Sequence, residues 1–244
     1  MTLIGKQTGY LGAPMKKRKL VVLSGAGISA ESGLRTFRDK DGLWEEFPIE
    51  EVATPYAWTL DPEKVLRFYD RRREQVLAAE PNAAHFAIAA LEEHFEVEVI
   101  TQNIDDLHER AGSTNVLHLH GEIKKARSTA DPSLIVPIEG SCLALGALCP
   151  KGSQLRPHIV WFGEEVPFLP QAAAQVMKAD RLLIVGTSLN VYPAAGLVHY
   201  APASCPVHLV DPADVPIARH GVVHIKETAS VGVPRLAAEW SEGY

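Results

Sequence analysis

Short, uninterrupted runs of apolar residues recur along the chain. Such runs predict strands that are buried on both faces of a parallel sheet. They are found at residues 20–23, 97–100, 116–119, 182–185, 207–210 and 222–225. Between several of them the apolar positions follow a helical period, as at 82–94, where Asn82 is placed to cap a helix. Strands that alternate with helices predict an α/β fold with a Rossmann-like, doubly wound parallel sheet.

Two stretches interrupt this alternation. Residues 36–80 contain a polar loop and a long helix, expected to begin at Asp61-Pro62 with aspartate as the cap and proline in the first turn. Residues 122–155 are punctuated by proline, glycine and serine and show little periodicity. We therefore expect a single domain over residues 1–244 with a small inserted subdomain, and a ligand crevice between the two parts. The Rossmann-like core is predicted at about 19–35, 81–121 and 156–240.

Composition and charge narrow the class of protein. Apolar residues make up 46% and charged residues 22% of the chain, which is typical of a globular protein. The net charge of −6 gives no general attraction for nucleic acid, and the basic run at 16–19 is interpreted as a solvated arm. Prolines and polar residues break the longest uncharged stretch, 182–210, so no membrane span is expected. Three cysteines and no recognisable secretory signal favour a cytoplasmic protein.

A glycine-rich turn follows the first predicted strand. The segment from Gly25 to Ala30, Gly-Ala-Gly-Ile-Ser-Ala, fits the G-x-G-x-x-A pattern of dinucleotide-binding folds. In that pattern the first glycine permits the turn, the second admits a pyrophosphate and the small third residue lets helix and strand pack. Alone the pattern is also compatible with a purely structural turn, and the acidic residue expected about 20 positions later is not clearly placed.

The blocks that follow the turn carry a resemblance to a known family. The turn continues into Glu31-Ser32-Gly33, Thr36-Phe37-Arg38 and Gly42-Leu43-Trp44. Four more blocks follow: Thr-Gln-Asn-Ile-Asp-Asp-Leu-His at 101–108, His-Leu-His-Gly at 118–121, Arg-Pro-His-Ile-Val-Trp-Phe-Gly-Glu at 156–164 and Gly-Thr-Ser at 186–188. In order and spacing they resemble the sirtuin family, desuccinylase-like branch of bacterial type, over about residues 20–234. The resemblance implies an NAD-dependent protein-lysine deacylase (deacetylase, desuccinylase and demalonylase) that transfers the acyl group to ADP-ribose and releases nicotinamide.

Three residues match the family's catalytic positions. His120 lies at the end of a predicted strand before Gly121, and imidazole titrates near neutrality, as a general base requires. The resemblance implies that His120 accepts a proton from a ribose hydroxyl, that Asn103 orients a ribose hydroxyl or a water, and that Asp105 holds the nicotinamide amide. For Asn103 and Asp105, capping of a helix at 104–110 is the structural alternative. His118 is expected to face away from the site.

The resemblance also implies a set of cofactor-binding residues for NAD. Phe37 would cover the reactive ribose and Arg38 would face the phosphates. Asp211 stands near the position where many sirtuins have asparagine on the adenosine ribose. The full set is Gly25, Ala26, Gly27, Ala30, Glu31, Thr36, Phe37, Arg38, Trp44, Gln102, Asn103, Ile104, Asp105, Gly186, Thr187, Ser188, Asp211 and Ala229.

Two further segments are predicted to bind the substrate. We expect residues 160–164 to form an edge strand that pairs with an acyl-lysine protein or peptide, with Val160, Phe162, Gly163 and Glu164 as contacts. Tyr69 and Arg72 are three residues apart on the long helix and so lie side by side. A phenol beside a guanidinium suits a carboxylate, and the pair resembles the Tyr-x-x-Arg of the desuccinylase branch. The alternative is that Tyr69 packs in the core and Arg72 belongs to a solvated arginine run at 71–73.

Departures from the family bear on metal binding. Most sirtuins hold a structural zinc with four cysteines, but residues 127–131 contain none and the second pair is reduced to Cys149. We expect no structural zinc, because two thiolates do not complete a closed site, and an apolar core that includes Leu134, Ile135, Val136 and Leu143. A monomer is expected. Two other functions remain open, an ADP-ribosyltransferase or NAD hydrolase using the same pocket, and a non-catalytic nucleotide sensor.

Overall fold

The computed structural model describes residues 16–36 and 47–242. Its main sheet contains six strands, all parallel, in the order β3-β2-β1-β7-β8-β9. The six runs expected from the sequence form these strands, which confirms the doubly wound α/β fold. Their bounds are β1 Lys19–Ser24, β2 Glu96–Thr101, β3 Val116–His118, β7 Arg181–Val185, β8 Val207–Val210 and β9 Val222–Ile225.

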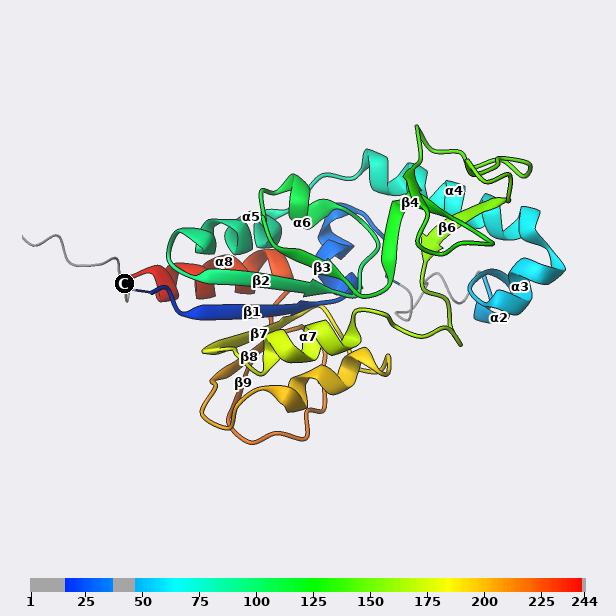
Figure 1. Cartoon of the computed structure of the whole chain (residues 1–244). Helices are drawn as coiled ribbons and strands as arrows, with labels where there is room; N and C mark the ends of the chain where they lie inside the picture. Colours follow the sequence, from blue (N-terminus) through cyan, green and yellow to red (C-terminus); the bar gives the residue numbers. More distant parts are fainter. Residues whose placement is uncertain (1–15, 37–46, 243–244) are drawn as a thin grey trace, which may run out of the picture.

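Helices cover both faces of this sheet (Figure 1). In β1, Val21 faces a core formed with α7 and the 3-10 helix η3, whereas Leu20 and Val22 face a core formed with α5 and α8. Both faces of the strand are therefore buried, as its continuous apolar run predicts. The helices are α5 Ala83–Ala90, followed by η2 Leu91–Glu93, and α7 Leu169–Val176, η3 Ala194–Tyr200 and α8 Ala229–Ser241.

A second, smaller unit lies beyond the carboxyl ends of these strands (Figure 1). Its described residues form an antiparallel sheet in the order β5-β4-β6 and three helices. The boundary placed at residue 156 falls inside β6, which pairs with β4, so the smaller sheet extends further along the chain than the sequence indicated. The bounds are α2 Ile49–Val52, α3 Pro55–Leu60, α4 Pro62–Ala78, β4 Gly121–Ser128, β5 Ile135–Pro137 and β6 Leu155–Ile159.

The long helix α4 begins where the sequence predicts. The Asp61 side chain accepts a hydrogen bond from the backbone N–H of Lys64, and Pro62 takes the first helical position. Such a cap contributes about 1 kcal/mol of stability. Leu143 is buried in the apolar cluster of the small sheet, with Leu134 and Val136 packed against it. Ile135 was expected in this core but is 43% exposed, because the residues on either side of it, Leu134 and Val136, pack against the cluster instead.

The order of the strands locates a ligand crevice. From β1 the chain proceeds outward to β2 and β3, and then returns to β7 on the other side of β1 before it continues to β8 and β9. Parallel sheets bind ligands at the carboxyl ends of the strands where this order reverses. The reversal lies between β1 and β7. The glycine turn directly follows β1, and residues 186–188 directly follow β7. Among the described residues, no helix combines the length and apolar character needed to cross a membrane.

Candidate active site

A cavity of about 520 Å³ opens at this reversal point, a size common for small-molecule and cofactor sites. Its walls come from the ends of β1, β2, β7 and β8 and from the smaller unit. It therefore joins segments that are far apart in the sequence. The described members of the predicted site that line it are Gly25, Ala26, Gly27, Ala30, Glu31, Thr36, Tyr69, Arg72, Gln102, Asn103, Ile104, His120, Val160, Phe162, Gly163, Glu164, Gly186, Thr187, Ser188, Asp211 and Ala229.

The glycine turn packs against a second glycine on the neighbouring strand end. The backbone N–H of Gly27 donates to the carbonyl of Gly186 over 2.8 Å. A Cβ at Gly27 would lie 2.7 Å from Gly186 Cα, and one at Gly186 would lie 2.1 Å from the nitrogen of Ile28. Close backbone packing thus requires these glycines even before a ligand is considered. The turn continues as a 3-10 helix, η1 Ala26–Ser32, where the sequence indicated a helix.

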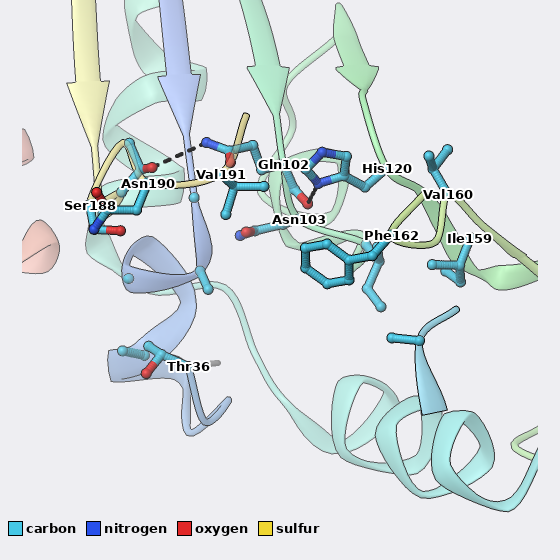
Figure 2. Close-up of a pocket in the computed structure, with 18 of the residues that line it drawn as sticks. Thr36, Gln102, Asn103, His120, Ile159, Val160, Phe162, Ser188, Asn190 and Val191 are labelled. Carbon is cyan, nitrogen blue, oxygen red and sulfur yellow. Dashed lines mark hydrogen bonds between the residues drawn. The ribbon is translucent and has the colours of Figure 1, made fainter. Parts of the chain in front are cut away.

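His120 is held with one ring nitrogen directed into the protein. Strand β3 ends at His118, and His120 follows in the connection to β4. Its Nδ1 is 3.1 Å from the backbone carbonyl of Gln102 (Figure 2). A carbonyl only accepts, so Nδ1 carries the hydrogen and Nε2 keeps a lone pair. That tautomer suits a general base, as predicted for His120.

The pH dependence of catalysis tests this assignment. Burial lowers the pKa of His120 from its ordinary 6.5, and the Gln102 carbonyl opposes that shift. The neutral, basic form therefore persists below pH 6.5 and is lost as the pH falls through the lowered value. We expect kcat/KM for an acetyl-lysine peptide to show an acid limb centred below pH 6.5. A limb centred above 6.5 in pre-steady-state or steady-state rates would contradict the assignment.

Asn103 and Asp105 are connected through Ser29. The Asn103 amide nitrogen donates to Ser29 Oγ at 3.1 Å, and this hydroxyl donates to Asp105 at 3.2 Å. This hydrogen bond fixes the orientation of the side-chain amide, whose oxygen can then accept from a hydroxyl or a water. Ser29 is buried and was not predicted as a site residue, although it lies inside the glycine motif.

Asp105 was expected either to cap a helix or to bind the nicotinamide amide, and its contacts fit the first role in part. Its carboxylate accepts from the backbone N–H of Leu107, the first residue of α6 Leu107–Arg110, so the capping alternative holds in part. Burial raises the pKa of Asp105, with the Leu107 hydrogen bond and the Arg72 charge opposing. Asp105 lines a smaller neighbouring cavity together with His118 and does not line the main one. His118 contacts the Asn103 carbonyl and Glu109, so it faces away from the site as expected.

Gln102 bridges two strand ends. Its side-chain amide donates to Thr187 Oγ1 at 3.1 Å, while its backbone carbonyl holds His120 (Figure 2). Thr187 Oγ1 also accepts from the backbone N–H of Leu189. The ends of β2 and β7 are thus tied together across β1, next to Ser188.

The far wall of the cavity contains the residues expected near adenosine. The Asp211 carboxylate accepts from the backbone N–H of Ala213 at 2.9 Å. Ala229 begins α8, and the Glu31 carboxylate accepts from the backbone N–H of Ser230 beside it. Phe37, Arg38 and Trp44 lie outside the described residues. Several lining residues of the loops after β7 and β8 match no motif in the sequence, although the polar and proline-rich composition of these loops is a signal: Asn190, Val191, Tyr192, Pro193 and Pro212.

The expected edge strand at residues 160–164 is replaced by a turn. Strand β6 ends at Ile159, and the backbone N–H of Glu164 donates to the carbonyl of Trp161 at 3.0 Å. Gly163 adopts a φ of 90°, which a strand does not allow. The Glu164 carboxylate receives Arg127, Arg156 and the backbone N–H of Trp161. The Phe162 ring lies between Asn103 and Ile159 in the view of Figure 2.

Tyr69 and Arg72 both reach the cavity from α4. The side chains are buried, with exposures of 3% and 5%, and both line the main cavity together with His120. Tyr69 belongs to an apolar cluster, so part of the structural alternative is correct. Arg72 is not solvated: of the three arginines at 71–73, only Arg71 is exposed. Burial lowers the pKa of Arg72 to about 10, opposed by Asp105, and the group stays charged at neutral pH.

Comparison with known proteins gives a consistent result. The model of the Sir2 family matches residues 25–193. An NAD-dependent protein deacylase of Helicobacter pylori (strain ATCC 700392 / 26695) is 56% identical over 195 residues, covering 80% of this chain and 85% of that protein. A protein of the same name from Bacteroides thetaiotaomicron is 50% identical over 226 residues, covering 90% of this chain and 96% of that protein.

Solved structures show the same architecture. A Sir2 homologue–ADP-ribose complex superposes with a TM-score of 0.87 at 40% identity, covering 93% of both chains. A Sir2 homologue–NAD complex has a TM-score of 0.84 at 40% identity, covering 93% of this chain and 91% of that one. A Sir2 protein with a deacetylated p53 peptide and 3′-O-acetyl-ADP-ribose has a TM-score of 0.80 at 31% identity, covering 91% and 94%.

Proposed function

Since the chain belongs to the Sir2 family and is an NAD-dependent protein deacylase, we propose that it removes succinyl and malonyl as well as acetyl groups from lysine. One observation carries the proposal: Tyr69 and Arg72 are buried at the wall of the cavity that also contains His120. A buried guanidinium offers a planar pair of N–H donors, and the neighbouring phenol offers a hydroxyl. Both groups suit the carboxylate of a succinyl or malonyl group.

The cavity fits NAD in its size and in its bare backbone at the glycines. When bound, NAD supplies the ribose carbon that loses nicotinamide and the ADP-ribose that receives the acyl group. We propose that the backbone around Gly25, Gly27 and Gly186 and the hydroxyl of Ser188 lie along its phosphates and ribose. Asp211 and Ala229 would lie at the adenosine end.

Three groups of this chain would act on the reacting atoms. His120 accepts a ribose hydroxyl proton at Nε2, the nitrogen that the Gln102 carbonyl leaves unprotonated. Asn103 accepts from a ribose hydroxyl or a water through its amide oxygen and, with Asp105, is positioned through Ser29. Asp105, beside the main cavity, would bind the nicotinamide amide once the ligand has entered.

We propose that the turn after β6 binds the substrate through its backbone. The backbone N–H of Val160 donates to the carbonyl of His120, and that of Phe162 donates to the carbonyl of Ala53. The turn therefore connects the candidate catalytic histidine with the smaller unit. Gly163 and Glu164, which follow in the turn, would present their backbone to an acyl-lysine peptide. Backbone recognition makes selectivity for the surrounding sequence loose.

A direct experiment distinguishes this function from its alternatives. Acetyl-, succinyl- and malonyl-lysine peptides are incubated with NAD, and all products are weighed by mass spectrometry. We expect free lysine peptide, nicotinamide and acylated ADP-ribose in equal amounts. Nicotinamide release without lysine release would indicate an NAD hydrolase, and a peptide heavier by one ADP-ribose would indicate a transferase. No turnover of any peptide would support a nucleotide sensor.

The cellular setting is also part of the proposal. The charge of −6 argues against nucleic acid as a partner, and three cysteines favour the cytoplasm. We propose a monomer that acts there on acyl-lysine proteins. Size-exclusion chromatography with light scattering tests the monomer.

We further propose that the small subdomain is held together without zinc. Cys149 Sγ lies 3.4 Å from Ser128 Oγ, and Lys151 pairs with Asp131 at 2.7 Å. Within residues 16–36 and 47–242, no three histidine, cysteine or carboxylate side chains are grouped to hold a metal. A hydroxyl, a thiol and an ion pair thus link the two loops that cysteine pairs would join.

Elemental analysis should therefore find far less than one zinc per purified chain, and a chelator should leave the unfolding temperature unchanged. The expected reason is that the apolar cluster around Leu143 carries the packing. About one zinc per chain, with unfolding on addition of chelator, would refute the proposal.

A further inference from the structure

The hydroxyl of Tyr69 has a buried hydrogen-bond donor behind it. The indole Nε1–H of Trp161 donates to Tyr69 Oη at 3.0 Å. Both side chains are buried, at 2% and 3% exposure, and both line the main cavity. Trp161 comes from the turn after β6 and Tyr69 from α4, so this bond links two residues that are 92 positions apart in the sequence.

This bond fixes what the phenol can offer to a ligand. An oxygen that accepts from an indole N–H keeps its own hydrogen to donate. Burial raises the pKa of Tyr69, so the phenol stays protonated. Among the described residues, no oxygen takes the Tyr69 hydroxyl hydrogen, and the cavity lies beside it. The hydroxyl is therefore set to act as a donor toward a cavity ligand.

Trp161 is itself held at two points. The guanidinium of Arg156 lies 3.4 Å from the centre of its ring. Arg156 also donates to both carboxylate oxygens of Glu164, at 2.7 and 3.0 Å, and Glu164 accepts the backbone N–H of Trp161 at 2.8 Å. The guanidinium covers one face of the indole and Glu164 holds the Trp161 backbone, and together these contacts fix the direction of the indole N–H.

We propose that Trp161 is a specificity-determining positioning residue, which directs the Tyr69 hydroxyl so that it and the Arg72 guanidinium receive the carboxylate of an acidic acyl group together. The inference rests on the proposed desuccinylase function. A phenylalanine at position 161 would fill most of the same space but would not donate. The Tyr69 hydroxyl would then rotate freely, and its hydrogen bond to the acyl carboxylate would lose its preset direction.

The test compares the succinyl to acetyl ratio of kcat/KM in wild type, Trp161→Phe, Tyr69→Phe and the double variant. We expect Trp161→Phe to lower this ratio about tenfold, or about 1.4 kcal/mol, mainly through a higher KM for succinyl-lysine peptide. In the Tyr69→Phe background the same change should have little further effect, because the two residues act as one unit. Trp58→Phe is the matched control. Its ring lies 5.8 Å from that of Trp161 in the same cluster, and it should keep the wild-type ratio.

The outcomes separate the inference from the function beneath it. If wild type desuccinylates and Tyr69→Phe lowers the ratio but Trp161→Phe does not, positioning by Trp161 is wrong and the proposed function stands. If wild type does not desuccinylate, the proposed function fails.

A second measurement needs no change at Trp161. In protein with ¹⁵N-labelled tryptophan, the Trp161 indole resonance should move in Tyr69→Phe and on addition of succinyl-lysine peptide, and move less with acetyl-lysine peptide. A resonance that does not respond to Tyr69→Phe would overturn the inference.

Discussion

Replacing His120 with alanine should lower kcat/KM for deacylation about a hundredfold to ten-thousandfold, the usual effect of removing a general base. The loss should fall mainly on kcat, because the proton acceptor is needed in the chemical step. His120 is only half-buried, and within the described residues its side chain makes one hydrogen bond, to the Gln102 carbonyl, so the fold should survive. Single-turnover rates with acetyl-lysine peptide and thermal unfolding measure the two effects separately.

The matched control is His199→Ala. His199 is exposed on η3 and does not line the cavity, so this variant should keep both rate and unfolding temperature. A well-folded His120→Ala protein with near-full activity would remove His120 from the mechanism. A loss that is explained by unfolding alone would leave no catalytic effect to assign.

Replacing Arg72 with methionine should reduce kcat/KM for succinyl-lysine peptide about a hundredfold, with a much smaller change for acetyl-lysine peptide. Methionine has similar length and fills the site without a charge. The lost interaction is a charge-assisted pair in a buried setting, for which removal of one partner costs about 3–5 kcal/mol at the upper end. The effect should appear chiefly in KM, since the guanidinium binds the acyl end and not the reacting carbon.

Arg71→Met is the control for this substitution. It removes the same charge from the same turn of α4, but Arg71 is exposed and should leave the selectivity between acyl groups unchanged. Equal losses on acetyl and succinyl peptides in Arg72→Met would show that Arg72 is structural. The alternative result, no detectable desuccinylation by the wild type, would reject the substrate class itself.

The strands and the start of α4 could be predicted because their signals are local. A buried parallel strand needs only a short apolar run, and the cap at Asp61 needs only the aspartate and the proline after it. The glycine turn could also be recognised from its local pattern, but one of the two reasons for glycine at position 27 could not. Gly27 is required by contact with Gly186, and no local pattern states which distant backbone will approach it.

The errors arose where distant partners decide. The edge strand expected at 160–164 is a turn, because the Glu164 carboxylate accepts from the Trp161 backbone and is held by Arg127 and Arg156. For the three arginines at 71–73 the sequence left a solvated run and a ligand contact open. Arg72 is buried at the cavity, whereas Arg73 donates to the Ile123 carbonyl of β4 and only Arg71 is exposed. Asp105 could not be assigned to capping or to ligand from sequence, because its position also depends on Ser29 from another strand end.

The two packed units of the chain contain different groups of proposed functional residues, so each group can be substituted separately. The candidate base and the glycine turns belong to the ends of the parallel strands, whereas Tyr69 and Trp161 belong to an apolar cluster of the inserted unit. Under the proposed function, substitutions in α4 would change which acyl group is accepted and leave His120 and the glycine turn in place. For engineering of acyl selectivity, residues 62–78 are therefore the first segment to exchange.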